Sequence, residues 1–518
     1  MTSGTSVSSF PLNIGTAQDF ARARSLLENA GYNEASVCDL LKICQMSDLS
    51  TASREQFDLN ASSASKLGVL VRVFLFLDTI SAGQAQHFIG QETVESLLAL
   101  DLFRRTASES ASNGNPGYYS SVWLYPIREM VVASDRSDNP DDLPLGSKRD
   151  PVFPALYPGT FLFLKLVSQS PALDVLDLCC GSGVGALILS RHAKQAVASD
   201  ISLRATHFVR FNARLNGCDN LQAVQSDFYS AFEGQSFDRI LAHPPYVPSL
   251  SNEVVWRDGG ETGETPMRRI VEGLSQYLRP GGTFYSVCAG FDCTNSGFEA
   301  RVRNWLGQSH DDFDVIFAFN REKSIRHLAR ELVERTPKAA AADVSRWEEV
   351  FKKIGAVRHV HGGLVIHRRR PAQGATRIPL TLRTRLSDAT DGSSFEQAFR
   401  WHYWLARPPT EQELSQLKPR LSSQLQVRVT HVVSDKSLVP AEFVLESARP
   451  FLAETRVDSW IAQVVSELDG SLTLTEFYQK ARTAAVLPET IDFSDFLKLA
   501  LNLIERGYLE VDDAVFSA

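Results

Sequence analysis

The central part of the sequence predicts an α/β fold built on a parallel sheet, and three observations support it. Strand-like apolar segments alternate with helical segments across residues 151–370. A glycine-rich turn, residues 181–183, follows the first of these strands, and acidic residues, Asp200 and Asp227, end the next two. Alternation of this kind is typical of a parallel sheet covered by helices on both faces.

The N-terminal part of the chain has a different pattern. Helical periodicity dominates residues 16–105, and two β-rich runs about a turn follow at residues 118–135. We therefore predict a helical, winged-helix-like domain over residues 1–115, followed by a β wing and linker over residues 116–150.

The central domain, residues 151–370, contains seven strand-like segments. They are residues 172–180, 195–201, 221–227, 237–243, 283–290, 313–319 and 362–368. The connection between the sixth and seventh strands, residues 321–355, is long and helical, so we predict that it contributes to a lid. The basic run that ends the seventh strand, residues 367–370, is expected to lie at a solvated edge.

The C-terminal domain, residues 371–518, is predicted to be helical or winged-helix-like. Its last part has the pattern helix, Asp-Gly turn, helix, longer helix and short strand, and is similar to peptide-recognition modules of the PqqD type. The longer helix carries Lys498 and Arg506 amid apolar residues, a composition that favours packing against protein over binding DNA.

Composition and charge limit the class of function. The 518 residues are 43% hydrophobic and 22% charged, as in ordinary globular proteins, and suffice for two to four domains. A net charge of −8 gives no overall attraction to nucleic acid, so nucleic acid is an unlikely partner. No signal peptide or membrane-spanning run stands out, and we expect a cytoplasmic protein that contacts no membrane. The seven cysteines match neither a disulfide framework nor a metal site, so free thiols and no metal are expected.

The chemistry is predicted at the ends of the first three strands of the central domain. Residues 174–190 run from a buried strand through the glycine-rich turn into a helix, which brings the backbone close to a ligand. The Asp200 carboxylate can accept from both hydroxyls of a ribose, and Asp227 can accept from the amino group of an adenine. One aspartate after a strand is usually a turn former, but two after a glycine turn favour a nucleoside site.

These motifs carry a family resemblance. The segments "VLDLCCGSG", "ASDIS", "QSDFY" and "LAHPPYVP" occur in the order found in class I S-adenosylmethionine-dependent methyltransferases. Residues 243–284 resemble more closely the HemK/PrmC-type protein-glutamine N5-methyltransferases, with His243 where their Asn-Pro-Pro-Tyr signature has asparagine. The resemblance implies a Rossmann-like, seven-stranded sheet with an antiparallel last hairpin. It also implies S-adenosyl-L-methionine bound over the carboxyl ends of the first strands, and methyl transfer without a metal.

The resemblance also implies roles for single residues. It implies that Asp177, Gly181 and Gly183 bind the methionine end of the cofactor. Asp200 would bind the ribose, and Asp227 with Phe228 would bind the adenine. The full set of predicted cofactor-binding residues is Thr160, Asp177, Cys179, Gly181, Gly183, Asp200, Ile201, Asp227, Phe228 and His243.

The acceptor end is predicted from the "HPPY" motif. In the family, the asparagine oxygen and the first proline carbonyl hold the acceptor nitrogen while the aromatic ring packs on it; Pro244 and Tyr246 retain two of these parts. His243 can accept a hydrogen bond as a neutral ring or, titrating near neutrality, can take a proton. Alternatively, the ring only caps the strand end. The predicted catalytic residues are His243, Pro244 and Tyr246.

The predicted substrate-binding residues are Tyr246, Trp256 and Arg257. Arg257 suits a substrate carboxylate, and pairing with Asp258 is an equal alternative.

The sequence thus predicts an S-adenosylmethionine-dependent methyltransferase acting on a nitrogen of a protein, peptide or amino-acid-like small molecule. Three alternatives stay open: an oxygen acceptor deprotonated by His243, a nucleic-acid base, and a non-catalytic S-adenosylmethionine-binding scaffold protein.

Overall fold

The structure is a computed structural model and divides into two compact units. It describes residues 10–50, 65–106, 117–136, 150–250, 255, 257–335, 344–370, 378–406 and 409–512. The first unit comprises residues 1–164, 169–290 and 332–351, and the second comprises residues 165–168, 291–331 and 352–518. The four predicted domain ranges stay a prediction.

One eight-stranded sheet, in the order β13-β11-β12-β10-β9-β6-β7-β8, confirms the α/β class. Its strands are β6 (Ala172–Leu178), β7 (Ala193–Asp200), β8 (Leu221–Gln225), β9 (Phe237–Ala242), β10 (Leu278–Cys293), β11 (Phe313–Ser324), β12 (Ala356–Arg368) and β13 (Thr381–Arg385). All seven predicted segments are strands. β11 and β12 pair antiparallel, as the resemblance implies. The sequence did not predict the eighth strand, β13, which pairs parallel to β11.

The strand order reverses beside β6. β7 and β8 follow on one side of β6 and β9 lies on the other, and all these pairs are parallel. The register pairs Leu178 with Ala242, so the loops after β6 and β9 are neighbours. Such a switch point, at the carboxyl ends of the strands, is where open α/β sheets bind ligands.

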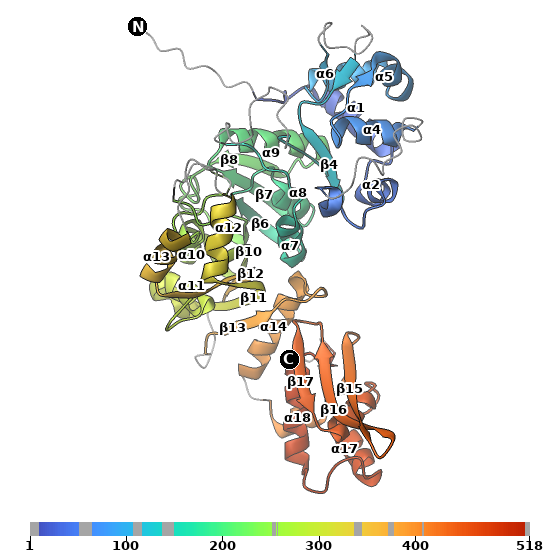
Figure 1. Cartoon of the computed structure of the whole chain (residues 1–518), viewed down its shortest axis with the longest axis vertical. Helices are drawn as coiled ribbons and strands as arrows, with labels where there is room; N and C mark the ends of the chain where they lie inside the picture. Colours follow the sequence, from blue (N-terminus) through green and yellow to red (C-terminus); the bar gives the residue numbers. More distant parts are fainter. Residues whose placement is uncertain are drawn as a thin grey trace. The chain divides into compact units, whose positions relative to one another are not determined.

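Helices accompany the strands of this sheet (Figure 1). They are α7 (Pro158–Leu166), α8 (Val184–Ser190), α9 (Leu203–Asn216), α10 (Thr265–Tyr277), α11 (Phe298–Trp305), the 3-10 helix η3 (Gly307–Asp312), α12 (Ile325–Arg335) and α13 (Val344–Lys353). Every residue of α8 is buried, so this helix belongs to the core next to the sheet. α12 and α13 confirm that the long connection between the sixth and seventh predicted strands is helical; its role as a lid stays a prediction.

The N-terminal segment supplies helices and a small sheet. Its helices are α1 (Ala17–Asn29), α2 (Glu34–Leu41), the 3-10 helix η1 (Met46–Ser50), α4 (Lys66–Phe74), α5 (Ala82–Phe88) and α6 (Gln91–Ala99). The small sheet has the order β1 (Ile80–Ser81), β3 (Gly117–Tyr119), β2 (Arg104–Arg105). From α4 onward the order is helix, strand, helix, helix, strand, strand, which agrees with the winged-helix-like prediction.

A β-hairpin, β4 (Trp123–Ile127) with β5 (Met130–Ser134), confirms the two β-rich runs about a turn. Its strand β5 docks on α9 through two asparagines. The Asn212 side chain accepts from the Ala133 N–H at 2.8 Å and donates to the Ala133 carbonyl at 3.0 Å. Asn216 bonds the N–H and the carbonyl of Val131 in the same way. The two side chains thus supply the hydrogen bonds that a neighbouring strand would otherwise make with β5.

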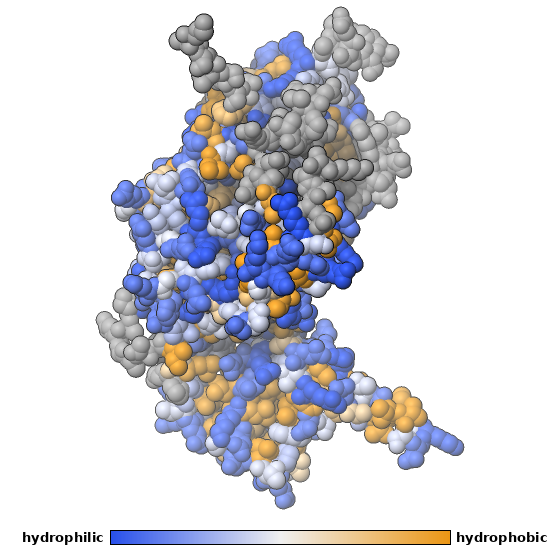
Figure 2. Space-filling model, turned by 60° about the vertical axis from the view of Figure 1, so that its left-hand side comes forward, coloured by the Kyte–Doolittle hydropathy of each residue, from blue (hydrophilic) through white to orange (hydrophobic). Residues whose placement is uncertain are grey.

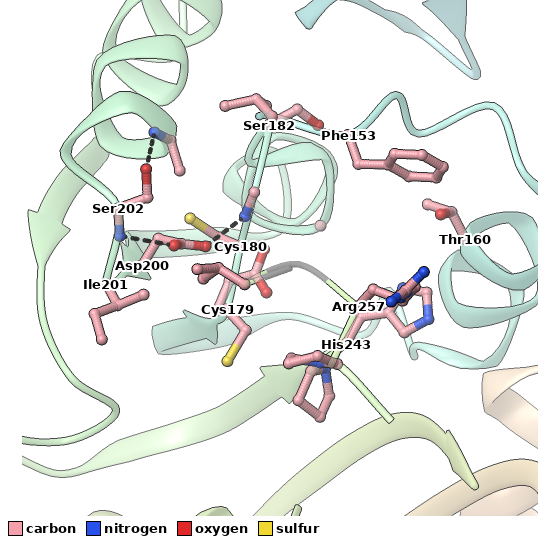
Figure 3. A pocket seen from close by; sticks show the side chains of 18 of the residues that line it. Phe153, Thr160, Cys179, Cys180, Ser182, Asp200, Ile201, Ser202, His243 and Arg257 are labelled. Carbon is pink, nitrogen blue, oxygen red and sulfur yellow. Dashed lines mark hydrogen bonds between the residues drawn. The ribbon is translucent and has the colours of Figure 1, made fainter. Parts of the chain in front are cut away.

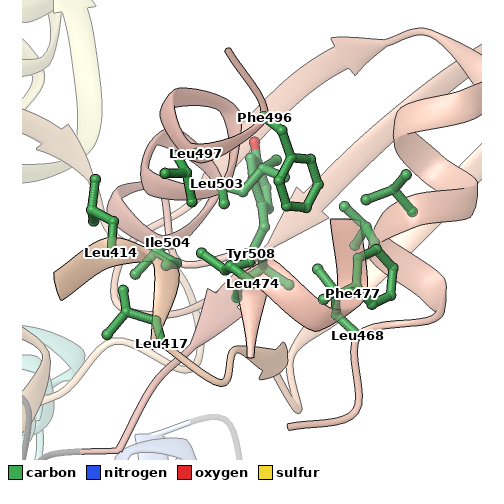
Figure 4. Packing of buried hydrophobic residues seen from close by; sticks show 14 of the residues in the cluster. Leu414, Leu417, Leu468, Leu474, Phe477, Phe496, Leu497, Leu503, Ile504 and Tyr508 are labelled. Carbon is green, nitrogen blue, oxygen red and sulfur yellow. The ribbon is translucent and has the colours of Figure 1, made fainter. Parts of the chain in front are cut away.

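The C-terminal part of the second unit has its own apolar core. Its elements are α14 (Gly392–Ala406), α15 (Glu411–Ser415), β14 (Arg420–Leu421), β15 (Leu425–Ser434), β16 (Ser437–Ser447), β17 (Ala453–Val457), α16 (Ser459–Ser466), α17 (Leu474–Thr483), α18 (Phe493–Glu505) and β18 (Leu509–Glu510). The predicted sequence of helix, turn, helix, longer helix and strand is confirmed from α16 to β18. Leu474, Phe477 and Phe496 pack in the core, together with Tyr508 at the end of the segment (Figure 4).

The antiparallel sheet β15-β16-β17 was not predicted. β15 and β16 are joined by a two-residue turn, Asp435 and Lys436, both with positive φ. Pro440 interrupts the strand-like pattern of the sequence, because proline is disfavoured within sheets. In the structure it lies at the register shift of the hairpin. The far half of the hairpin projects as an arm (Figure 2), with Val433 77% and Leu438 70% exposed.

Within the described part of the chain, the helices are too short or too polar to span a bilayer. All seven cysteines are free.

Candidate functional site

A cavity of about 660 Å³ lies at the carboxyl ends of β6, β7, β8 and β9 (Figure 3). The predicted site residues that line it are Thr160, Asp177, Cys179, Gly181, Asp200, Ile201, Asp227, Phe228, His243, Pro244, Tyr246 and Arg257. Gly183 does not line the cavity, and Trp256 lies outside the described residues. Residues from four separate loops thus meet at one edge of the sheet.

The loop after β6 has left-handed backbone at Cys179 (φ 54°), Gly181 (φ 53°) and Gly183 (φ 80°). A Cβ on Gly183 would lie 2.8 Å from Cγ2 of Val209 in α9, so this glycine permits close packing of the turn. A Cβ on Gly181 would meet nothing within 4 Å, because Gly181 borders open space in the cavity. Glycine at 181 therefore keeps the backbone accessible to a ligand.

Asp177 connects this loop to the following helix. Its side chain is buried, and Oδ2 accepts from the Ala186 N–H at 2.8 Å, in the first turn of α8. Gly185 leaves room for the carboxyl, since a Cβ there would lie 2.7 Å from Oδ2. Burial, with a contribution from the charge of Asp200, raises the pKa of Asp177 to about 7.

Asp200 connects the loops after β6 and β7. Its Oδ2 accepts from the Gly181 N–H at 3.0 Å and its Oδ1 from the Ser202 N–H at 3.0 Å (Figure 3). A carboxylate oxygen has two lone-pair positions, so each oxygen retains one for a ligand. Burial raises the pKa of Asp200, and Ile201 beside it is 54% exposed.

Asp227 forms an ion pair that the sequence did not predict. Its carboxylate accepts from both terminal nitrogens of Arg269, at 3.2 and 3.0 Å. The Arg269 guanidinium also lies 4.4 Å from the ring centroid of Phe228. Arg269 belongs to the polar face of α10, where no motif marks it; the fold alone brings it to Asp227, 42 residues earlier in the chain.

His243 follows β9 and contacts two aromatic rings. Its ring stacks on Phe163, with centroids 5.2 Å apart, and on Tyr246, with centroids 5.9 Å apart. Within the described part of the chain its ring nitrogens have no hydrogen-bond partner, so the ring does not cap the strand through a hydrogen bond. Burial lowers the pKa of His243 to about 4. The expectation that it titrates near neutrality was wrong, because a buried ring loses the water that stabilises its charged form.

The segment that carries Pro244 and Tyr246 is held by the loop that follows it. The Val247 N–H donates to the Arg257 carbonyl at 3.1 Å, and the Gly259 N–H donates to the Val247 carbonyl at 2.8 Å. The Arg257 side chain donates to Asp258 at 2.8 Å and also lines the cavity. The predicted Asp258 pair is therefore present, and binding of a substrate carboxylate by Arg257 stays a prediction.

One wall of the cavity is held by the N-terminal β-hairpin. Residues 150–155 line the cavity. The Tyr125 hydroxyl oxygen of β4 accepts from the Ala155 N–H at 2.7 Å, and Asp135 accepts from the Val152 N–H at 2.7 Å. Arg204 of α9 in turn holds Asp135 through a hydrogen bond of 2.7 Å. The hairpin thus shapes the site, which composition and motifs did not indicate.

Replacing Tyr125 with phenylalanine is expected to lower the free energy of unfolding by about 1–3 kcal/mol, because the buried Ala155 N–H loses its acceptor. Denaturant unfolding measures the change. Tyr119→Phe is the matched control, because its hydroxyl has no hydrogen bond within the described residues. Equal stability of the two variants would show that Tyr125 does not hold this wall.

The residues of the cavity fit a nucleoside that carries a charged amino-acid chain. The exposed backbone of a glycine turn, the carboxylates of Asp200 and Asp227 at strand ends, and the apolar side chains of Ile201 and Phe228 provide the contacts such a ligand needs. Among the described residues, no three side chains of His, Cys, Asp or Glu converge to form a metal site.

Comparison with known proteins agrees with this fit. A protein of Methanocaldococcus jannaschii, whose name describes an N5-glutamine methyltransferase, is 32% identical over 130 residues, 24% of this chain and 65% of that protein. The release factor glutamine methyltransferase of Thermodesulfovibrio yellowstonii is 32% identical over 134 residues, 23% of this chain and 48% of that enzyme. The ribosomal RNA small subunit methyltransferase C of Yersinia enterocolitica is 29% identical over 180 residues, 34% of this chain and 45% of that enzyme.

The chain spans between 45% and 65% of the length of these relatives. Residues 154–305 match the family described as the methyltransferase small domain. The match includes all the strand-end loops that line the cavity, and the family implies S-adenosylmethionine as the methyl donor. The part of the chain that matches this family is therefore the part that builds the cavity.

Proposed function

We propose that the whole chain is an S-adenosylmethionine-dependent methyltransferase that modifies a nitrogen of a polypeptide. The observation that carries this proposal is the convergence of the glycine turn, the strand-end aspartates and the "HPPY" segment on one cavity. A nucleoside-binding edge and a candidate acceptor-binding segment then lie side by side, as group transfer requires.

Bound S-adenosylmethionine would supply a methyl group on a positively charged sulfur. In the proposed roles, Asp200 accepts from the ribose hydroxyls through its remaining lone pairs, while Ile201 and Phe228 contact the adenine. Asp177 and Gly181 keep the loop after β6 in the shape that receives the methionine end. Thr160 and Cys179 line the same space.

The acceptor end requires alignment above all. A neutral His243 ring, with no partner among the described residues, can accept a hydrogen bond from an incoming N–H group. The rigid Pro244 presents its carbonyl as a second acceptor, and the Tyr246 ring offers a flat apolar surface. Two acceptors that point at the N–H groups hold the nitrogen lone pair toward the methyl group.

A polypeptide acceptor is supported by the mouth of the cavity. Tyr157, Ile201 and Val255 line the cavity and are 39%, 54% and 43% exposed. Exposed apolar side chains around a pocket are typical of surfaces that bind another protein. The names of two of the relatives above describe glutamine methyltransferases, one of them acting on release factors.

A nucleic-acid base is the second candidate, because one relative is named for ribosomal RNA. The charges of the cavity argue against it. Aspartates 150, 177, 200 and 227 line the cavity, and its two arginines, Arg257 and Arg269, are each paired with an aspartate. Phosphate groups bind where positive charge is in excess.

Radiolabelled S-adenosylmethionine decides between these acceptors. The full chain is incubated with the labelled cofactor and a cell lysate, and the labelled material is then treated with protease or with nuclease. We expect label in a macromolecular, protease-sensitive fraction, and incorporation about 100-fold slower with the His243→Ala variant. Nuclease-sensitive label would replace the protein acceptor with RNA or DNA. Cofactor binding without any transfer would support the scaffold alternative.

A further inference from the structure

We propose that Arg269 is a positioning residue that sets the preference of the site for adenine over other purines. The inference rests on the proposed function, because it concerns how the cavity recognises the base of the cofactor. Arg269 itself is not assigned a contact with the ligand; it acts through Asp227 and Phe228.

The first support is the geometry of the ion pair. Two nitrogens of one guanidinium bond the two oxygens of Asp227, at 3.2 and 3.0 Å. Bidentate pairing of this kind fixes the plane of the carboxylate. Each oxygen keeps one lone-pair position, so a fixed Asp227 can still accept from the exocyclic amino group of an adenine.

The second support is the contact with Phe228. The guanidinium lies 4.4 Å from the centroid of its ring, within the range of a cation–π interaction. Phe228 has left-handed backbone, with φ 50°, a conformation that needs support when the residue is not glycine. One arginine therefore holds both residues that are predicted to contact the base.

The exposure of the ion pair makes this support necessary. The side chains of Asp227 and Arg269 are 47% and 52% exposed, so the surrounding protein does not fix the carboxylate. Without the guanidinium, the carboxylate is free to rotate into solvent, and the aromatic ring loses its cover. Loss of Arg269 should therefore weaken the recognition of the amino group specifically.

The experiment compares two ligands by calorimetry, and it does not depend on activity. The ligands are S-adenosylhomocysteine and its analogue in which oxygen replaces the 6-amino group of the base. A hydrogen bond to a charged group predicts that the wild type prefers the amino ligand by about 10- to 100-fold. We expect Arg269→Gln to reduce this preference at least about fivefold. A purely structural defect would weaken both ligands equally and leave the preference unchanged.

Two further variants sharpen the result. Arg268→Gln is the matched control: Arg268 precedes Arg269 on α10, pairs with Glu272 at 2.9 Å and does not line the cavity. It should keep the wild-type preference. Asp227→Asn should abolish the preference, and adding Arg269→Gln to Asp227→Asn should then change it no further, because Arg269 acts through Asp227.

The outcomes separate this inference from the proposed function. Failure of the wild type to bind S-adenosylhomocysteine would overturn the proposed function. A wild type that binds and discriminates, together with an Arg269→Gln variant that keeps the same preference, would overturn the positioning role alone. Thermal denaturation of each variant checks that it is folded.

Discussion

Alanine in place of His243 is expected to leave the affinity for S-adenosylhomocysteine close to wild type and to reduce the rate of methyl transfer about 100-fold. The ring is proposed to hold the acceptor, and loss of alignment at the reacting atoms costs about this much. Calorimetry and single-turnover labelling measure the two effects separately. Wild-type turnover with alanine at this position would show that His243 does not touch the acceptor.

Asparagine at His243 separates positioning from proton removal. Asparagine offers a hydrogen-bond acceptor but cannot take a proton, so we expect His243→Asn to recover much of the lost rate. Because burial lowers the pKa of His243 to about 4, the wild-type rate should show no loss with an apparent pKa near 6–7. A rate that falls below about pH 6.5, without recovery in His243→Asn, would instead favour proton removal.

The pH profile must be read together with folding stability. Burial lowers the pKa values of His243 and His359 from 6.5 to about 4. As the pH falls from 6.5 toward 4, these two histidines become protonated in the unfolded chain but stay neutral in the folded chain. The free energy of unfolding therefore decreases. Rates below pH 6.5 should therefore be corrected for the fraction of protein that remains folded, which circular dichroism measures at each pH.

Alanine in place of Asp200 should weaken the binding of S-adenosylhomocysteine by about 1.5–3 kcal/mol, which is roughly 10- to 150-fold. The variant loses two effects at once. The carboxylate no longer accepts from a ribose, and its bonds to the Gly181 and Ser202 N–H groups, both 3.0 Å, no longer hold the two loops together. Calorimetric titration measures the change.

Asp219→Ala provides the control for this variant. Asp219 is exposed and lies before β8, at the edge of the sheet opposite the cavity. The same change of charge there should leave ligand affinity unaltered. Equal affinity of a folded Asp200→Ala variant and the wild type would remove Asp200 from the site.

The sequence predicted the sheet well because most of its strands carry buried residues on both faces. Such strands are near-continuous apolar runs, and all seven were recognised. β13 was not predicted because it is a short strand that contains Arg383 and Arg385 and has no buried residue. The β15-β16 hairpin was not predicted because Pro440 interrupts the strand-like pattern of the sequence and much of the hairpin is exposed. The hydrophobic periodicity of a sequence reflects which residues are buried. An element with few buried residues therefore shows no clear periodicity.

The site was predictable where the chemistry follows the strand ends. Asp200 is the last residue of β7, and Asp227 and His243 follow β8 and β9 closely; parallel strands bring such positions to one edge. The supporting residues come from elsewhere: Arg269 from the polar face of a helix, and Tyr125 from a hairpin of the N-terminal segment. Their roles depend on long-range packing, as does the lowered pKa of His243.

A crystal structure of the full chain with S-adenosylhomocysteine tests the central claim most directly. Electron density for the ligand is expected along the carboxyl ends of β6, β7 and β8. The ribose hydroxyls should lie within hydrogen-bond distance of Asp200, the base beside Phe228, and the sulfur directed toward His243. Density at another place, or crystals that remain without ligand at saturating concentration, would contradict the assignment of this cavity as the methyl-transfer site.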